Sequence, residues 1–183
     1  MSKPLILILG RSGCGKNYIA TKLERKGYNL VKSYTTRPIR QDDPNDINTH
    51  TFISPDRVDD YKDDIVADTT FNGAYYFATR QQLNTADIYI LDKAGLECVC
   101  KNYHDRKILA FYIDCDSSIC AERMSKRGDS DEAIMSRLQH DMKAFEGVKE
   151  MCNYSFTNET QEQANDIADY IANTLEHWNG DRQ

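Results

Sequence analysis

The chain has 183 residues, a length that suits one domain with room for a small insert. Hydrophobic residues make up 40% and charged residues 28% of the chain, proportions that are typical of a globular protein. The net charge of −6 leaves no excess of cations to neutralise a phosphate backbone, so nucleic acid is not expected as a partner. No apolar stretch approaches the length of a membrane span, so a membrane is not expected as a partner either.

The six cysteines bear on the compartment of the protein. The sequence opens with an aliphatic stretch rather than with the pattern of a secretory signal, which predicts a cytoplasmic protein with reduced thiols. Cys98 and Cys100 lack a second cluster of ligands, so a zinc site is not expected there.

Residues 5–16, LILILGRSGCGK, carry the strongest functional signal. The aliphatic run Leu5–Leu9 predicts a buried strand, and a G-x-x-x-x-G-K pattern follows it and leads into an amphipathic helix. Backbone N–H groups in such a loop point into a concavity that binds a chain of phosphates, whereas a glycine-rich turn without a ligand is the alternative. The residues predicted to bind a triphosphate are Gly10, Arg11, Ser12, Gly13, Cys14, Gly15, Lys16 and Asn17.

Asn17 departs from the usual pattern of this loop. A serine or threonine at this position normally supplies a hydroxyl ligand to Mg²⁺. The amide oxygen of Asn17 can still accept a cation or a bridging water, so we predict it as a metal ligand.

Residues 33–40, SYTTRPIR, form a second patch with phosphate-binding chemistry. Arg37 and Arg40 flank Pro38, which keeps the segment out of a helix. Two guanidinium groups beside several hydroxyls suit a phosphate monoester, because arginine offers it paired donors. A solvated basic loop is the alternative interpretation.

The residues after this patch indicate a small antiparallel unit. A strand is expected at 51–54 and a short acidic helix at 55–62. Residues 65–70 and 74–78 predict a hairpin, with Asn72-Gly73 as the turn.

The rest of the chain alternates strands and helices, which predicts an α/β fold with a doubly wound parallel sheet. Ligands are then expected beyond the carboxyl ends of the strands. The expected strands are 5–9, 28–31, 88–91, 108–113 and 154–157. Helices are expected to begin near Lys16, after Asp92, at Asp116 or Ser117, near Asp131, and at a capping box of Thr160 and Gln163.

A third cationic cluster lies on two of these helices. Arg123, Arg127 and Arg137 could close over a transferring phosphoryl group and offset its charge. For Arg123 and Arg127, a solvated helix face paired with Glu122 or Asp131 is an equal alternative. Together, the three cationic clusters predict a kinase that phosphorylates a monophosphate.

These motifs resemble those of the guanylate kinase family. The family's loop for the phosphate of GMP is similar to SYTTRPIR, and its phosphate-binding loop is similar to LILILGRSGCGK. Its strand-turn-strand with the nucleotide tyrosine resembles FNGAYYFAT, and its lid resembles RMSKRG with the later Arg137-Leu138. The resemblance implies transfer of a phosphoryl group from ATP to GMP or dGMP, with Mg²⁺ as the metal.

The family's architecture implies a single guanylate kinase-like domain over residues 1–183. Its P-loop core would carry an inserted α+β subdomain that binds the nucleoside monophosphate, and a helical lid. The core would comprise 1–32, 85–122 and 146–183, the insert 33–84, and the lid 123–145.

The resemblance also implies roles for single residues. The catalytic residues would be Lys16, Arg37, Arg127 and Arg137. ATP would be bound by the loop 10–17 together with Arg123, Arg127 and Asn158. The monophosphate would be bound by Ser33, Arg37, Arg40, His50, Asp68, Tyr76 and Asp92. Asp92 would join Asn17 as a metal ligand.

Several positions depart from the family pattern. His50 replaces a phosphate-binding tyrosine, and a protonated His50 could donate to the monophosphate, which would raise activity on mild acidification. The family's glutamate that contacts guanine aligns near Ala67, and Asp68 is the nearest carboxylate. Ala78 replaces a serine that also contacts guanine, and Ala94 replaces the second acid of the family's D-x-D pattern. A kinase for another phosphorylated sugar, of the ribose 1,5-bisphosphate type, and a catalytically dead interaction domain are the alternatives. The sequence predicts no oligomeric state.

Overall fold

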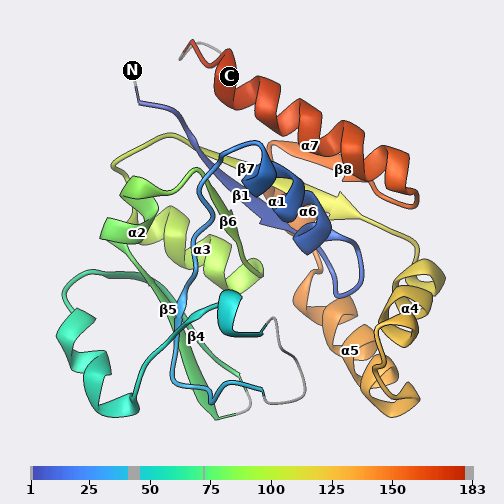
Figure 1. Cartoon of the computed structure of the whole chain (residues 1–183), viewed down its shortest axis with the longest axis horizontal. Coiled ribbons are helices and arrows are strands. Elements are labelled where there is room, and N and C mark those ends of the chain that lie inside the picture. The colour runs from blue at the N-terminus through green and yellow to red at the C-terminus, as the bar shows by residue number, and fades with distance from the viewer. Residues whose placement is uncertain (1, 41–45, 72, 180–183) are drawn as a thin grey trace.

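The computed structural model describes residues 2–40, 46–71 and 73–179 (Figure 1). Its core is a four-stranded parallel sheet in the order β6-β1-β7-β8 with helices on both faces, which confirms the predicted α/β class. The strands of this sheet are β1 (Leu5–Leu9), β6 (Ile88–Ile90), β7 (Ile108–Asp114) and β8 (Tyr154–Thr157).

The central strand β1 is buried on both faces, which explains its unbroken aliphatic run. Ile6 and Ile8 belong to a hydrophobic cluster that includes α1 (Lys16–Arg25) and α7 (Gln161–Glu176). The odd-numbered residues of β1 belong to a second cluster, which includes α3 (Lys93–Asn102). The alternation of side chains along one strand therefore fixes a helical layer on each face of the sheet.

Local caps fix where several helices begin and end. The capping box of Thr160 and Gln163 is present at the start of α7, as predicted. Asp116, one of the two predicted caps, begins α4 (Ser117–Lys126) by accepting a hydrogen bond from the N–H of Ser118. The next helix along the chain is α5 (Asp131–Ala144).

A second sheet, in the order β3-β2-β5-β4, lies below the core in Figure 1, on the opposite side from α4 and α5. The predicted hairpin is confirmed as the antiparallel pair of β4 and β5, although Asn72 of its turn lies outside the described residues. The strands of this sheet are β2 (Tyr34–Thr35), β3 (Thr51–Phe52), β4 (Ile65–Phe71) and β5 (Ala74–Thr79). The division of the chain into core, insert and lid stays a prediction.

Some expected elements differ in the structure. The predicted strand at 28–31 is reduced to an isolated bridge between Leu30 and Ile88, because the chain then leaves the core to enter the second sheet. The predicted helix at 55–62 is the 3₁₀ helix η2 (Pro55–Tyr61). The sequence analysis missed four short elements, namely strand β2, η1 (Asp46–Asn48), α2 (Arg80–Thr85) and α6 (Val148–Met151). No helix in the described ranges has both the length and the apolar character that crossing a bilayer requires.

The loop between β1 and α1 is packed against the backbone of other segments. Gly13 has a φ of 79°, and a Cβ added to it would lie 2.6 Å from the carbonyl oxygen of Cys120 in α4. A Cβ on Gly10 would meet the carbonyl oxygen of Ile113, and one on Gly15 would meet the amide of Asn158. The loop therefore requires glycine at these three positions because neighbouring chain segments leave no room for a side chain.

We expect Gly13→Ala to lower the free energy of unfolding more than Gly27→Ala does. Gly27→Ala serves as the matched control. Both glycines have a positive φ, but nothing lies within 4 Å of a Cβ added to Gly27. Gly27→Ala should therefore cost about 1 kcal/mol of backbone strain, and Gly13→Ala about 2 kcal/mol more because of the clash. Urea denaturation measures both values, and equal losses would contradict this account of the loop.

Candidate functional site

The glycine-rich loop places several cationic and N–H groups at the carboxyl end of β1. Lys16 begins α1, and its Nζ lies 2.5 Å from the carbonyl oxygen of Gly10 and 2.9 Å from that of Arg11. Asn17 is exposed in the first turn of the same helix. The positive end of the helix dipole and the lysine therefore act at the same place, as anion binding requires.

Two loop residues have partners on other elements. The Arg11 side chain donates to the carbonyl oxygen of Cys115 at 2.6 Å and to the hydroxyl of Ser117 at 3.0 Å, so it is directed toward the start of α4. The N–H of Ser12 donates to a carboxylate oxygen of Asp141 in α5, at 2.6 Å. Sequence analysis missed Asp141, because nothing in the local pattern of α5 distinguishes it from an exposed acid.

Three buried thiols lie under the loop. Cys14, Cys115 and Cys120 are each 2% exposed or less, and all six cysteines of the chain are free. Burial raises the pKa of Cys120 to about 12. Arg123 donates to the sulfur of Cys115 at 3.5 Å. These thiols are part of the packing that supports the loop.

Arg123 and Asn158 hold the loop from the side of β8. Arg123 donates to the carbonyl oxygen of Asn158 at 3.0 Å, and the Asn158 side chain donates to the carbonyl oxygen of Cys14 at 2.7 Å. Asn158 Oδ1 is buried and has no hydrogen-bond partner among the described residues. The two residues border a cavity of about 390 Å³, which is lined by Tyr18, Arg123, Asn158, Thr160, Gln161 and Ala164.

Arg37 forms a paired contact with a carboxylate that sequence analysis missed. Its two terminal nitrogens each lie 2.8 Å from an oxygen of Asp46, which is 1% exposed. The Arg40 N–H also donates to Asp46, at 2.7 Å. The Arg37 guanidinium holds the pKa of Asp46 well below its usual range. The sequence contains three aspartates close together in this segment, and spacing alone could not tell which one pairs with Arg37.

A second group of side chains lies close to the Arg37–Asp46 pair and consists of His50, Ser33 and Tyr76. His50 Nδ1 lies 3.1 Å from the Ser33 hydroxyl, and its ring stands edge-on to that of Tyr76 with centroids 5.5 Å apart. Burial lowers the pKa of His50, and the positive charge of Arg37 lowers it further. Three of the seven residues that the sequence analysis assigned to the monophosphate are therefore brought together.

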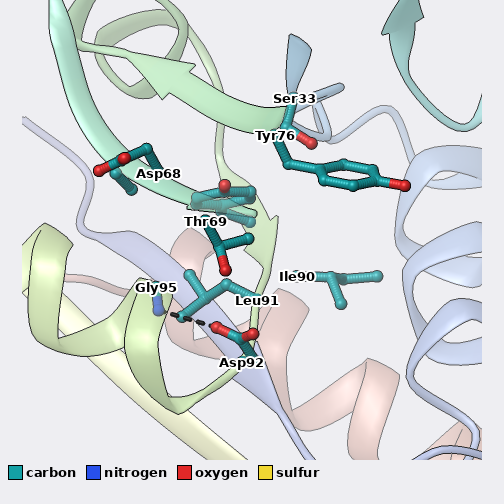
Figure 2. Close-up of a pocket in the computed structure, with 10 residues that line it drawn as sticks. Ser33, Asp68, Thr69, Tyr76, Ile90, Leu91, Asp92 and Gly95 are labelled. Carbon is teal, nitrogen blue, oxygen red and sulfur yellow. Dashed lines mark hydrogen bonds between the residues drawn. The ribbon is translucent and has the colours of Figure 1, made fainter. Parts of the chain in front are cut away.

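A cavity of about 290 Å³ lies between the second sheet and the end of β6 (Figure 2). Thr69 and Tyr76 are opposite each other in the β4–β5 pair and border this cavity. Asp92 follows β6, and one of its oxygens accepts the N–H of Gly95 at 2.8 Å, so it also caps α3. The cavity is lined by Ser33, Ala67, Asp68, Thr69, Tyr76, Tyr89, Ile90, Leu91, Asp92 and Gly95.

The Asp68 side chain is directed differently from the other predicted residues. Its carboxylate accepts a hydrogen bond from the Tyr75 hydroxyl at 3.0 Å, and Figure 2 shows it pointing away from Tyr76 and Asp92. The neighbouring Ala67 faces Ala78 across the two strands, and both are buried. Of these two alanines, only Ala67 borders the cavity, and it places a methyl group there rather than a polar base contact.

Two of the three arginines of the predicted lid, Arg127 and Arg137, converge on one carboxylate. Arg127 donates to Asp129 from Nε at 3.1 Å and from Nη2 at 2.5 Å, and Arg137 Nε lies 4.0 Å from the same oxygen. Arg123 lies apart from them, on the glycine-rich loop. Arg127 and Arg137 thus form one cationic cluster, whose counter-charge is Asp129 rather than Asp131.

Mg²⁺ commonly takes one or two protein oxygens and completes its shell with phosphates and waters. Among the described residues, no group of three or more His, Cys, Asp or Glu side chains could hold a metal without such help. Asn17 has an exposed amide, and Asp92 has a carboxylate at the cavity. This donor set fits an ion that is brought in with a nucleotide rather than a resident metal.

Comparisons with known proteins agree with this arrangement. A protein-family model described as an AAA domain matches residues 6–143. A guanylate kinase from Fusobacterium nucleatum is 25% identical over 180 residues, which cover 92% of this chain and 96% of that protein.

Two solved structures share the fold. A guanylate kinase from Anaplasma phagocytophilum aligns with a TM-score of 0.63 and 20% identity, covering 96% of this chain and 86% of the other. A gluconokinase from Sinorhizobium meliloti aligns with a TM-score of 0.54 and 13% identity, covering 95% and 94%. The chain therefore belongs to the AAA domain family, as a divergent guanylate kinase-like P-loop protein.

Proposed function

We propose that the protein transfers the γ-phosphoryl group of ATP to the phosphate of a nucleoside monophosphate, with GMP and dGMP as the first candidates. The observation that carries the proposal is that the glycine-rich loop and the cavity beside Asp92 lie at the same edge of the sheet. β1 and β6 are parallel neighbours, so the loop after β1 and Asp92 after β6 lie side by side. The donor phosphates would occupy the loop, and the acceptor would occupy the cavity beside Asp92.

Different cationic residues would bind the donor phosphates and the acceptor phosphate. Lys16 and the loop N–H groups would hold the donor, while Arg127 and Arg137 would offset the charge that develops on the transferred group. Arg37, oriented by Asp46, would act on the acceptor phosphate, and its Nε has no hydrogen-bond partner among the described residues. The attacking oxygen already belongs to a phosphate, so positioning can supply most of the rate without a general base.

Mg²⁺ is the metal that we expect to accompany ATP, held by Asn17 and Asp92 in addition to the phosphates. When bound, it would neutralise part of the phosphate charge. The amide oxygen of Asn17 is a weaker ligand than a carboxylate, so the phosphates and waters would carry most of the coordination.

A phosphorylated sugar of the ribose 1,5-bisphosphate type is a second candidate acceptor. The observation that favours it is the wall of the cavity, where Ala67 presents a methyl group and the Asp68 carboxylate is directed toward Tyr75. Reading a guanine edge requires buried polar partners, and an unpaired edge is costly. Hydroxyls of Ser33, Thr69 and Tyr76 border the cavity and suit the hydroxyls of a sugar.

We expect formation of ADP from ATP and Mg²⁺ when a suitable acceptor is added. The assay compares GMP, dGMP, AMP, UMP, CMP, dTMP and ribose 1,5-bisphosphate at equal concentration. Lys16→Ala should lower turnover roughly 100-fold or more, because it removes a charge that stabilises the transferring group. Lys26→Ala is the matched control, since Lys26 pairs with Asp169 on the surface and should leave turnover unchanged.

The pattern of turnover discriminates between the candidates. Turnover with GMP or dGMP supports the first acceptor class, and turnover only with the bisphosphate supports the second. No turnover with any acceptor would contradict the kinase proposal and would favour an interaction domain.

We also expect binding of the acceptor to depend on the protonation of His50. Burial lowers the pKa of this ring below its ordinary value, so the ring is neutral at neutral pH and gains its proton only on acidification. The protonated ring attracts the acceptor phosphate. The KM for the acceptor should therefore fall roughly fivefold as the pH is lowered from about 7.5 to about 5.5.

The comparison that isolates this effect is the ratio of KM values for the wild type and His50→Gln across the same pH range. Titration of the substrate phosphate is common to both proteins and cancels in the ratio. Parallel pH profiles would remove His50 from phosphate binding.

A further inference from the structure

Asp141 is a buried carboxylate that the proposed reaction does not use. It lies in α5, the helix that carries Arg137, and it is 6% exposed. One of its oxygens accepts the N–H of Ser12 at 2.6 Å, and the other lies 3.2 Å from Nδ1 of His140. This contact joins α5 to the glycine-rich loop across 129 positions of sequence.

The partner of Asp141 belongs to a loop that is built for anions. Backbone N–H groups of a glycine-rich loop serve as donors to phosphate oxygens, and a carboxylate offers the same kind of acceptor with the same sign of charge. Asp141 therefore takes up one donor of the loop and adds a negative charge beside the others. Lys16 is similarly engaged, by the carbonyl oxygens of Gly10 and Arg11.

A role in packing alone does not account for an acid at this position. Removing a carboxylate from water is costly, and one backbone N–H with one histidine nitrogen replaces only part of its hydration. The Asp141 carboxylate nevertheless lies against the glycine-rich loop and not on the exposed face of α5.

We propose that Asp141 is a gate for the donor phosphates. Its carboxylate accepts the Ser12 N–H and joins α5 to the loop. A phosphate chain that enters the loop competes with this carboxylate for donors and is opposed by its charge. Asp141 therefore lowers the affinity of the loop for phosphates, and phosphate binding releases α5 from Ser12.

The test is the affinity of the full-length protein for inorganic tripolyphosphate and for ATP, measured by calorimetry without Mg²⁺. Asp141→Asn keeps the size of the side chain and an oxygen acceptor but removes the charge. We expect this variant to bind tripolyphosphate about fivefold more tightly than the wild type, with a gain that shrinks as salt is added. Tripolyphosphate carries no base, so its binding reports the loop and not the acceptor cavity.

Asp169→Asn is the matched control. It makes the same change of net charge on the surface of α7, where Asp169 pairs with Lys26, and it should leave both affinities unchanged. A folded Asp141→Asn variant that binds tripolyphosphate as weakly as the wild type, or more weakly, would overturn the proposal and make Asp141 a structural anchor.

A second measurement uses the wild type and does not depend on the variant folding. The hydrogen bond joins the Ser12 amide proton to a carboxylate oxygen of Asp141, so the Ser12 amide proton and the side-chain carboxyl carbon of Asp141 both report on it. Saturation with tripolyphosphate should shift both NMR resonances together with the Lys16 amide. If the Lys16 amide shifts while the Ser12 and Asp141 signals stay in place, the carboxylate is not displaced and the gate does not exist.

Discussion

The close packing of the glycine-rich loop is the constraint on which the rest of the site depends. Gly10 is pressed against β7, Gly13 against α4, and Gly15 against Asn158, so the loop is held by three segments that are distant in sequence. Because β1 is buried on both faces, the strand that delivers the loop cannot shift without disturbing both hydrophobic clusters. The positions of Lys16 and of the N–H groups are consequences of this packing.

The second organising feature is internal charge compensation. Three groups that are suited to bind phosphate already have a carboxylate partner within the protein, namely Asp46 for Arg37, Asp129 for Arg127 and Asp141 for the Ser12 N–H. Cations gathered without anions would repel one another, and buried ones would lose hydration without replacement. The carboxylates let the site stay assembled without a ligand, and a ligand must then compete with them.

Features with local signals were predictable from the sequence. The glycine-rich loop, the Thr160–Gln163 capping box and the β4–β5 hairpin each depend on residues within a few positions of one another. The partner of Ser12 is 129 positions away, and its identity depends on how α5 packs on the core, which no local pattern reveals.

The face on which a strand residue lies was also hard to predict. A shift of one position along a strand exchanges the two faces, so Thr69 lies opposite Tyr76 while the carboxylate of the neighbouring Asp68 contacts Tyr75. The register shift between Ile65 and Ala67 removes the simple alternation from which this could have been counted. The short helices α2 and α6 span too few turns to give a helical period.

The buried thiols under the loop have a consequence for how its motion can be observed. Cys120 is inaccessible, and its raised pKa keeps it in the unreactive thiol form, so a thiol reagent can reach it only when the loop and α4 separate. The rate at which Cys120 is labelled therefore reports the free energy of the opening that exposes it. The protein thus contains a natural probe of the rigidity of its own phosphate-binding loop.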